Sequence, residues 1–246
     1  MSQLSQQKNS LQQRVGRITG LLLFTGMIAF QFSQLRNLTW SFDHWLAFTR
    51  WGLITLLFAL FLSAYVIRKP AVEEAKGLKE TLLPLFCAGL PFAIIMFPNP
   101  AYELAHRAGW FETRDFLLYL FQCRIGEYHP EGLIVMAIGE VITIGGMLTL
   151  KGSFSIFSEA RERVSSGLYR WIRHPLYSGE ILSLIGFAIF WPSYWSLCLT
   201  LLFIISQSIR AKVEEAKLIS SFPDYAIYRE EVGFLLPKLI RKNQNT

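Results

Sequence analysis

The sequence contains little charge for its length: Asp, Glu, Lys and Arg make up 17% of its 246 residues. Soluble domains usually carry about a quarter charged residues, so an ordinary water-soluble globule is disfavoured. Three cysteines are too few for a disulfide scaffold, and no CxxC or Cys/His spacing indicates a bound metal. The hydrophobic content of 52% excludes a disordered chain. The class that remains is an all-α, polytopic membrane protein, in which lipid replaces much of the polar surface.

Long apolar runs supply the segments that such a protein needs, because a helix requires about 20 apolar residues to cross a bilayer. Four runs approach that length: Arg17 to Leu35, Trp45 to Ile67, Thr81 to Pro98 and Gly132 to Leu150. A fifth run, Leu176 to Ile209, is too long for one span and is interrupted by Trp191-Pro192-Ser193. Proline breaks helices, so we expect a helical hairpin there, with a short first arm at about Ser178 to Phe190. The sequence therefore predicts a transmembrane bundle of about six spans.

The basic residues predict the orientation of these spans. The net charge is +6, and 19 of the 24 Lys and Arg residues fall on one side of a six-span arrangement. Cytoplasmic loops collect Lys and Arg, so both termini are expected in the cytoplasm, and nucleic acid is not expected as a partner. The first apolar run has no cleavage site behind it and is interpreted as a retained span. Trp110 to Cys123 contains charged residues and is interpreted as a surface helix or a partial insertion.

The loop after the fourth span is the first candidate site. Gly167 permits a tight turn, and Pro175 pushes His174 towards an extended conformation at the start of a helix near Leu176. That helix N-terminus, together with His174 and Tyr177, could hold a carboxylate or a phosphate. The same residue types also serve as anchors at the level of the lipid headgroups, and composition alone does not separate the two interpretations.

A second candidate lies after the last apolar run. Arg210 and Glu214 are four residues apart, so on a helix they share a face. Spacing alone favours a solvated ion pair. The alternative is a site at the membrane surface, where Arg210 holds an anionic group through two hydrogen bonds and Glu214 accepts hydrogen bonds from a ligand.

Both candidates belong to two linked blocks of sequence that resemble a known superfamily. The blocks resemble the isoprenylcysteine carboxyl methyltransferase and phospholipid methyltransferase superfamily, and the resemblance covers about the C-terminal third of the chain. It is carried by Gly167-Leu168-Tyr169, Arg173-His174-Pro175-Leu176-Tyr177-Ser178-Gly179, Arg210, Glu214-Glu215, Leu218, Phe222, Tyr225, Tyr228 and Pro237. The resemblance implies a methyltransferase core at 131–246, and it leaves 1–130 as an N-terminal transmembrane region of unassigned role.

The resemblance also implies a cofactor and residue roles. It implies an integral membrane enzyme that uses S-adenosyl-L-methionine, bound in a cytoplasmic pocket lined by Arg163, Val164, Tyr169, His174, Pro175, Leu176, Tyr177 and Glu214. Arg210 would face a lipophilic substrate near the transferring methyl, so Arg210 and Glu214 are the expected catalytic residues. A prenylcysteine-like carboxylate would need no general base. A phospholipid amine or a thiol would need one, and Glu214, Glu215 and Tyr177 are then candidates.

Two acids within the predicted spans remain, together with two rival functions. Glu140 is interpreted as a structural or a weak functional residue, and Glu180 either caps its helix or serves the site. The segment that ends in Glu180 also resembles NADPH-dependent sterol and steroid reductases, although the block from Arg210 to Glu215 favours the methyltransferases. A transporter is disfavoured because no internal repeat is found.

Overall fold

The structure is a computed structural model that describes residues 3–35, 45–96, 129–157 and 159–238. The segment Trp110–Cys123 lies outside these residues. Within them the chain is helical, and no strand is formed beyond two isolated bridges, Glu73 with Ala160 and Ile172 with Gly233. The prediction of an all-α protein is confirmed for this part of the chain.

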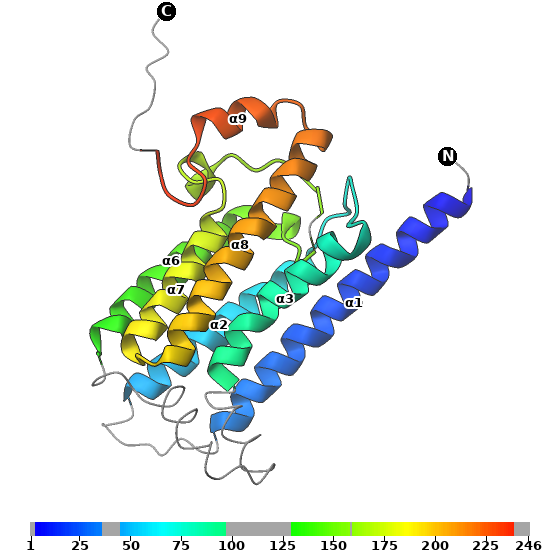
Figure 1. Cartoon of the computed structure of the whole chain (residues 1–246). Coiled ribbons are helices and arrows are strands. Elements are labelled where there is room, and N and C mark those ends of the chain that lie inside the picture. Colours follow the sequence, from blue (N-terminus) through cyan, green and yellow to red (C-terminus); the bar gives the residue numbers. More distant parts are fainter. Residues whose placement is uncertain (1–2, 36–44, 97–128, 158, 239–246) are drawn as a thin grey trace, which may run out of the picture.

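Long helices alternate in direction through the body of the molecule (Figure 1). They are α1 (Gln3–Gln34), α2 (Trp45–Val66), α3 (Gly77–Met96), α6 (Glu131–Leu150), α7 (Pro175–Phe190) and α8 (Tyr194–Ser221). Shorter elements are η3 (Lys151–Ser153), η4 (Gly167–Arg170) and α9 (Tyr225–Glu231). The helices follow the predicted apolar runs, although α1 begins well before Arg17 and α8 continues past Ile209. Two of the described helical stretches, Glu131–Ser153 and Tyr194–Ser221, are long and apolar enough to cross a membrane.

The predicted hairpin is present between α7 and α8. Helix α7 ends at Phe190, and α8 begins at Tyr194, three residues after Trp191. Ser193 and Ser196 form a reciprocal capping box, which satisfies backbone groups that the start of α8 would otherwise leave unpaired. The first arm has 16 residues and rises about 24 Å, less than the hydrocarbon thickness of a typical bilayer.

Helix α7 packs on α6 at very short range. A Cβ atom added to Gly139 would lie 2.4 Å from the backbone nitrogen of Ser183, and one on Gly186 would lie 2.4 Å from that of Met136. Glycines at such positions let helix backbones approach each other closely. The α6–α7 pair therefore forms a fixed wall, and the position of α7 sets that of the site at its N-terminus.

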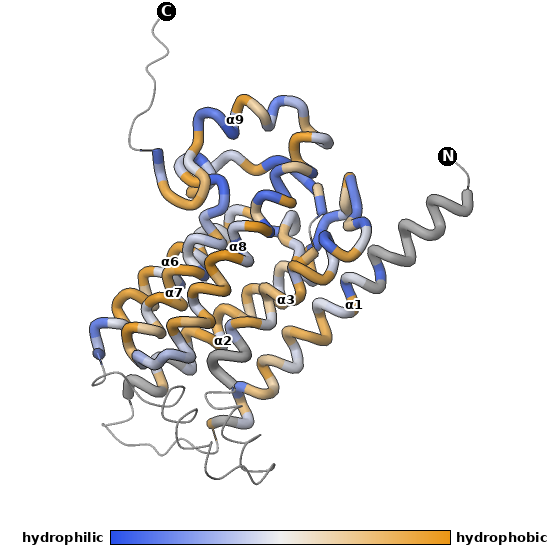
Figure 2. The backbone as a smooth tube through the Cα atoms, in the orientation of Figure 1, coloured by the Kyte–Doolittle hydropathy of each residue, from blue (hydrophilic) through white to orange (hydrophobic). Residues whose placement is uncertain are grey.

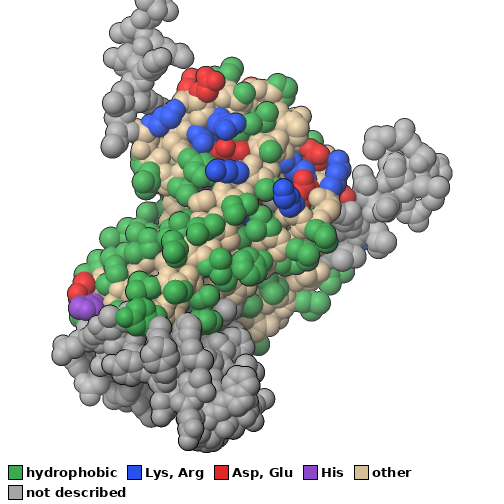
Figure 3. Space-filling model, viewed as in Figure 1, with side chains coloured by type: hydrophobic (Ala, Val, Ile, Leu, Met, Phe, Trp, Pro, Cys, Tyr) green, Lys and Arg blue, Asp and Glu red, His purple; other side chains and the backbone are tan. Residues whose placement is uncertain are grey.

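The body and the upper end of the molecule differ in surface chemistry. Apolar residues dominate the helices in Figure 2, and charged side chains gather at the upper end in Figure 3. We call that end the head; it consists of residues 67–76, 151–157, 159–174 and 222–238 with the last turns of α8. Large apolar side chains on the body remain exposed, among them Ile134, Val141, Leu201 and Ile205. Exposed apolar surface of this extent is typical of a lipid-facing or partner-facing surface.

An aromatic cluster joins the first two helices to the head. Phe24 and Phe61 stack with ring centroids 5.1 Å apart, and Phe154 stacks on Phe61 at the same distance. Tyr65 is fully buried, and its hydroxyl accepts a hydrogen bond of 3.0 Å from the backbone N–H of Ile156. The start of the α6–α7 loop is thus attached to α1 and α2.

Candidate functional site

The α6–α7 loop is held in the head by a buried ion cluster. Glu159 lies 2.6 Å from Arg68 and 2.5 Å from Arg161, and all three side chains are at most 5% exposed. Burial alone would raise the pKa of Glu159, but the two guanidinium groups hold it below its ordinary value. The carboxylate therefore stays charged and fixes the loop against the end of α2.

The second half of the loop turns at Gly167. Its φ of +56° lies in the left-handed region, which confirms the predicted tight turn. The turn leads into η4, where Tyr169 is buried and its carbonyl accepts a hydrogen bond of 2.5 Å from the hydroxyl of Tyr228. Arg163, further upstream, pairs with Asp224 at 2.9 Å. The contacts of Tyr228 and Asp224 thus attach the loop to α9 and to the residue that precedes it.

His174 stands at the start of α7, as its sequence context predicts. Its φ of −126° and ψ of 59° lie outside the helical region, and the helix begins at Pro175. His174 is 6% exposed, and its imidazole stacks on the ring of Tyr177, with centroids 5.5 Å apart and planes 3° from parallel. Phe234 closes the other side of the imidazole in an edge contact at 5.3 Å.

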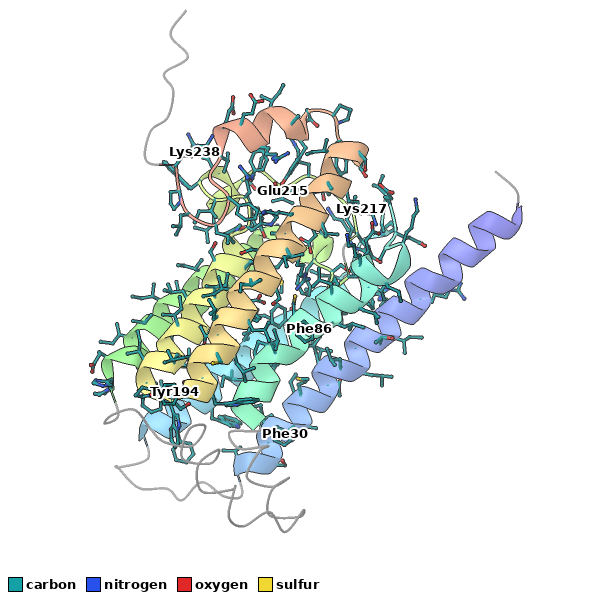
Figure 4. The ribbon with its side chains drawn as sticks, viewed as in Figure 1. Phe30, Phe86, Tyr194, Glu215, Lys217 and Lys238 are labelled. Carbon is teal, nitrogen blue, oxygen red and sulfur yellow. The ribbon has the colours of Figure 1, made fainter. Side chains whose placement is uncertain are left out.

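The carboxylate of Glu215 contacts this imidazole and two arginine side chains. Its carboxylate lies 3.2 Å from Nε2 of His174, 2.6 Å from Arg173 and 3.4 Å from Arg229. Figure 4 shows Glu215 on α8, below α9. Glu215 was considered as a general base from the sequence, but these contacts occupy it in holding His174. Lys217, on α8, reaches the carbonyl of Glu74 at 2.6 Å and the carboxylate of Glu80.

Tyr177, Arg210 and Glu214 form one connected group. The hydroxyl of Tyr177 donates to Oε1 of Glu214 at 2.5 Å, and Nε of Arg210 donates to the same oxygen at 3.2 Å. The guanidinium of Arg210 lies 4.8 Å from the centre of the Tyr177 ring, within the range of a cation–π contact. It also donates to the carbonyl of Ile156 at 2.7 Å. The pair that spacing alone placed in solvent is therefore largely buried.

These residues line a polar cavity in the head. It encloses about 750 Å³ of empty space, including its opening, which lies within the range of small-molecule sites. Its wall contains seven of the residues expected at a cofactor: Arg163, Val164, Tyr169, His174, Leu176, Tyr177 and Glu214. Pro175 is buried at the first position of α7 and is not part of this wall.

Several residues of this wall carry no site assignment from the sequence. They are Ser153, Phe154, Ser155, Glu159 and Arg161 from the loop, and Tyr225 and Tyr228 from α9. The two tyrosines occur in the blocks that carry the family resemblance, so that signal was present. The loop residues had only their position between the fourth span and Gly167 to indicate a role.

The tyrosines of the cavity outside the long helices are neutral hydrogen-bonding groups. Burial raises the pKa of Tyr169 well above its ordinary value and raises that of Tyr228 to about 12. Tyr225 is shifted in the same direction, also by burial. Since none of these phenols ionises near neutral pH, their oxygens can both donate and accept hydrogen bonds.

A second cavity, which is apolar, lies among the long helices. It encloses about 1050 Å³ and takes side chains from α1, α2, α3, α6, α7 and α8. Most of its wall is carbon, contributed by residues such as Phe24, Phe58, Leu184 and Phe203. Its polar residues include Glu140, Glu180, Gln207 and Arg210. Glu180 is the sixth residue of α7, beyond the first turn, so it does not cap that helix; its carboxylate accepts a hydrogen bond of 2.6 Å from Nε2 of Gln207.

The two cavities meet at one boundary. Tyr177 and Glu214 line the polar cavity, Arg210 lines the apolar cavity, and Phe154 lines both. Because Arg210 contacts both Tyr177 and Glu214, these three side chains lie where the two cavities adjoin. Such a boundary brings a polar molecule from the head close to a lipophilic molecule from the body.

Comparison with known families agrees with this class of site. Residues 129–224 match the family model described as phospholipid methyltransferase. The match contains α6, α7, α8 and the loop that forms most of the polar cavity wall. This part of the chain is similar to the phospholipid methyltransferase family, which confirms the resemblance seen in the sequence.

Two individual proteins are similar to about half of this chain. The chain is 29% identical over 151 residues to a protein-S-isoprenylcysteine O-methyltransferase of Tribolium castaneum. It is 32% identical over 146 residues to the protein of the same name from Xenopus laevis. The aligned regions cover 56% and 55% of this chain and 52% and 50% of the relatives, so the match spans about half the length of each.

A solved structure of a eukaryotic intramembrane Ras methyltransferase, isoprenylcysteine carboxyl methyltransferase, aligns with 94% of this chain and 96% of its own. Its TM-score is 0.41 and its sequence identity is 20%.

Proposed function

We propose that this chain is an integral membrane methyltransferase that uses S-adenosyl-L-methionine to methylate a lipophilic substrate at the cytoplasmic face of a membrane. The observation that carries the proposal is the boundary at Arg210, Tyr177 and Glu214, where a polar cavity in the head meets an apolar cavity in the body. A water-soluble methyl donor and a lipid-soluble acceptor require this pairing of environments.

The chemistry of the polar cavity suits the methyl donor. Arg163 in its wall, which pairs with the exposed Asp224, can offer hydrogen bonds to a carboxylate, and the tyrosines and Phe154 offer surfaces for an adenine ring. The carboxylate of Glu214 suits the positive charge of a sulfonium. S-adenosyl-L-methionine, when bound, supplies an electrophilic methyl group whose bond to sulfur breaks as the nucleophile's lone pair forms the new bond.

The residues of the boundary position the reactants and exclude water. Arg210 is held by Glu214, Tyr177 and the carbonyl of Ile156, so its guanidinium is fixed at the end of the apolar cavity. A fixed cation there orients the polar end of a substrate without a reorganisation cost during transfer. The apolar wall around that end keeps competing water away from the methyl group.

The proposed membrane topology follows the alternation of the helices. The six long helices would cross the bilayer with the head and both termini in the cytoplasm, where 19 of the 24 basic residues of the sequence would lie. The apolar surface of the body in Figure 3 supports this placement, because it would face lipid. The reductase alternative gains no support from the relatives described above, which are methyltransferases.

A binding measurement tests the cofactor. S-adenosylhomocysteine should raise the melting temperature of the detergent-purified protein, and NADPH should leave it unchanged. The reverse result would establish the reductase alternative instead. Incubation with labelled S-adenosyl-L-methionine and a membrane lipid extract should then transfer label to a lipid-soluble product, and Arg210→Ala should abolish that transfer.

A further inference from the structure

The apolar cavity contains polar atoms that have no partner in the protein. Gln207 is 1% exposed and Glu140 is 6% exposed, and both line this cavity. Gln207 uses its Nε2 to donate to Glu180, which leaves its carbonyl oxygen Oε1 without a hydrogen bond. Oε2 of Glu140 also has no hydrogen-bond partner. Both unpaired atoms are oxygens.

A buried polar atom without a hydrogen-bond partner costs free energy, so its presence suggests that a bound ligand satisfies it or that it has a functional role. The nearby cation does not supply a partner to either oxygen: Nε and Nη2 of Arg210 donate to Glu214, Ser155 and Ile156. An amide carbonyl oxygen and a carboxylate oxygen are both hydrogen-bond acceptors. The group that satisfies the two together is therefore a hydrogen-bond donor.

We infer that Glu140 and Gln207 form an acceptor site inside the apolar cavity, which selects lipophilic molecules whose polar end donates hydrogen bonds. An ammonium, a hydroxyl or a thiol fulfils this condition. A carboxylate does not, because it would bring further acceptor oxygens against Glu140, Glu180 and Gln207 without satisfying any of them. The positive charge of Arg210 does not reverse this preference, since Glu214 already accompanies it.

This inference deepens the proposed function and rests on it for one consequence. A protic group must lose a proton when it accepts a methyl group, whereas a carboxylate loses none. The carboxylates of Glu140 and Glu180 lie in the same cavity wall and can take that proton, so that an N–H, O–H or S–H bond breaks and an O–H bond forms. The acceptor site would then serve both recognition and proton removal.

Direct binding tests the acceptor site without any methyl transfer. The probes are radiolabelled hexadecanol, hexadecylamine and hexadecanoate, which share a chain length and differ in the polar end. Binding to the full chain in detergent is measured by scintillation proximity. We expect the alcohol and the amine to bind about tenfold more tightly than the carboxylate, the difference that one satisfied buried hydrogen bond produces.

Two variants assign that preference to named residues. Gln207→Met and Glu140→Met keep the side-chain length and remove the acceptors, so the tenfold preference should fall to about twofold or less. Leu184→Ala is the matched control in the same wall; it should weaken binding of all three probes equally, because it removes only contacts with the chain. Glu140→Met keeps the inference testable if Gln207→Met fails to fold, since Oε2 of Glu140 makes no hydrogen bond that its loss would break.

The outcomes separate the two proposals. Equal or tighter binding of the carboxylate, with no change in the Met variants, would overturn the acceptor site. The thermal shift by S-adenosylhomocysteine is measured on the same preparations and tests the proposed function independently. A normal shift combined with carboxylate preference would leave the methyltransferase standing and remove only the inference about its substrate.

Discussion

The two cavities adjoin each other but are built in different ways. The polar cavity is formed mainly by one continuous stretch, residues 150–177, and is completed by a few side chains from α8 and α9. The apolar cavity takes its wall from six helices between Leu23 and Arg210. The family match at 129–224 contains nearly all of the first wall and only part of the second. Under the proposed function, the methyl donor would bind to the segment that matches the family model, and substrate choice would depend also on α1, α2 and α3.

The largest expected effect comes from breaking the boundary itself. Arg210→Met removes the cation that lies between the cavities and leaves the carboxylate of Glu214 without its partner on α8. We expect methyl transfer to fall by about 100-fold or more, with a loss of about 3 kcal/mol in the free energy of unfolding. Label transfer and chemical unfolding in detergent measure the two effects.

Lys212→Met is the matched control for Arg210→Met, because Lys212 is exposed on the same helix and should be neutral in both assays. A folded Arg210→Met protein that kept half of its activity would show that the boundary is not where transfer occurs.

The polar cavity can be disturbed separately through its buried ion cluster. Glu159→Gln leaves Arg68 and Arg161 without a counter-charge, which should cost about 3 kcal/mol of stability. The native pKa of Glu159 is depressed, so its contribution is complete above the ordinary value of 4.5 and is lost as the pH falls through the lower, native pKa. The melting temperature of the variant should therefore depend less on acid pH than that of the wild type.

Glu162→Gln tests whether neutralising any carboxylate on the α6–α7 loop would lower stability as much as Glu159→Gln. Its side chain is 54% exposed and pairs with Lys69, so the change should alter stability by less than about 1 kcal/mol. Equal losses in the two variants would contradict the distinction between the buried and the exposed ion pair.

The apolar cavity can be disturbed through the wall that α6 and α7 share. Gly139→Ala places a methyl group 2.4 Å from the backbone of Ser183, and overpacking of this kind costs about 1–3 kcal/mol. Lipid binding should weaken more than binding of S-adenosylhomocysteine. Gly89→Ala on α3 meets nothing within 4 Å and should be neutral or slightly stabilising. A similar loss in both variants would refute the close packing of α6 on α7.

The smallest expected effect sharpens the assignment of one residue to one cavity. Tyr177→Phe removes the hydrogen bond to Glu214 and keeps the ring that stacks on His174 and faces Arg210. Affinity for S-adenosylhomocysteine should fall about fivefold, the equivalent of one modest hydrogen bond. Lipid affinity should stay the same. Tyr194→Phe, at the exposed start of α8, serves as the control. Weaker lipid binding with unchanged cofactor affinity would place Tyr177 on the apolar side.

The sequence predicted the features that depend on local pattern. Apolar runs located the helices, Pro192 located the hairpin, and Gly167 located a turn with positive φ. His174, Tyr177 and Glu214 could be grouped because two linked blocks resembled one superfamily. These residues then meet in one cavity wall, although their roles in binding and transfer remain proposals.

Features that depend on contacts across the chain could not be predicted. Glu215 was a candidate base, but its meeting with Arg173, His174 and Arg229 follows from the packing of α8 against the loop and α9. Gln207 is one polar residue within an apolar run, and nothing in its neighbourhood indicates that Glu180 lies across from it. A cavity assembled from six helices has no periodic signature in any one of them.

The glycine contacts between α6 and α7 bear on how a lipid would exchange with the bilayer. Backbones that touch at Gly139 and Gly186 cannot be parted by rotation of a side chain, so this seam stays shut. A lipid would then enter the apolar cavity between other helices, such as α1 and α2, where Phe24 and Phe58 form part of the wall. A lipid that entered there would have to displace these buried aromatic side chains. The dwell time of a product would accordingly be set by the N-terminal helices and not by the residues proposed to bind the methyl donor.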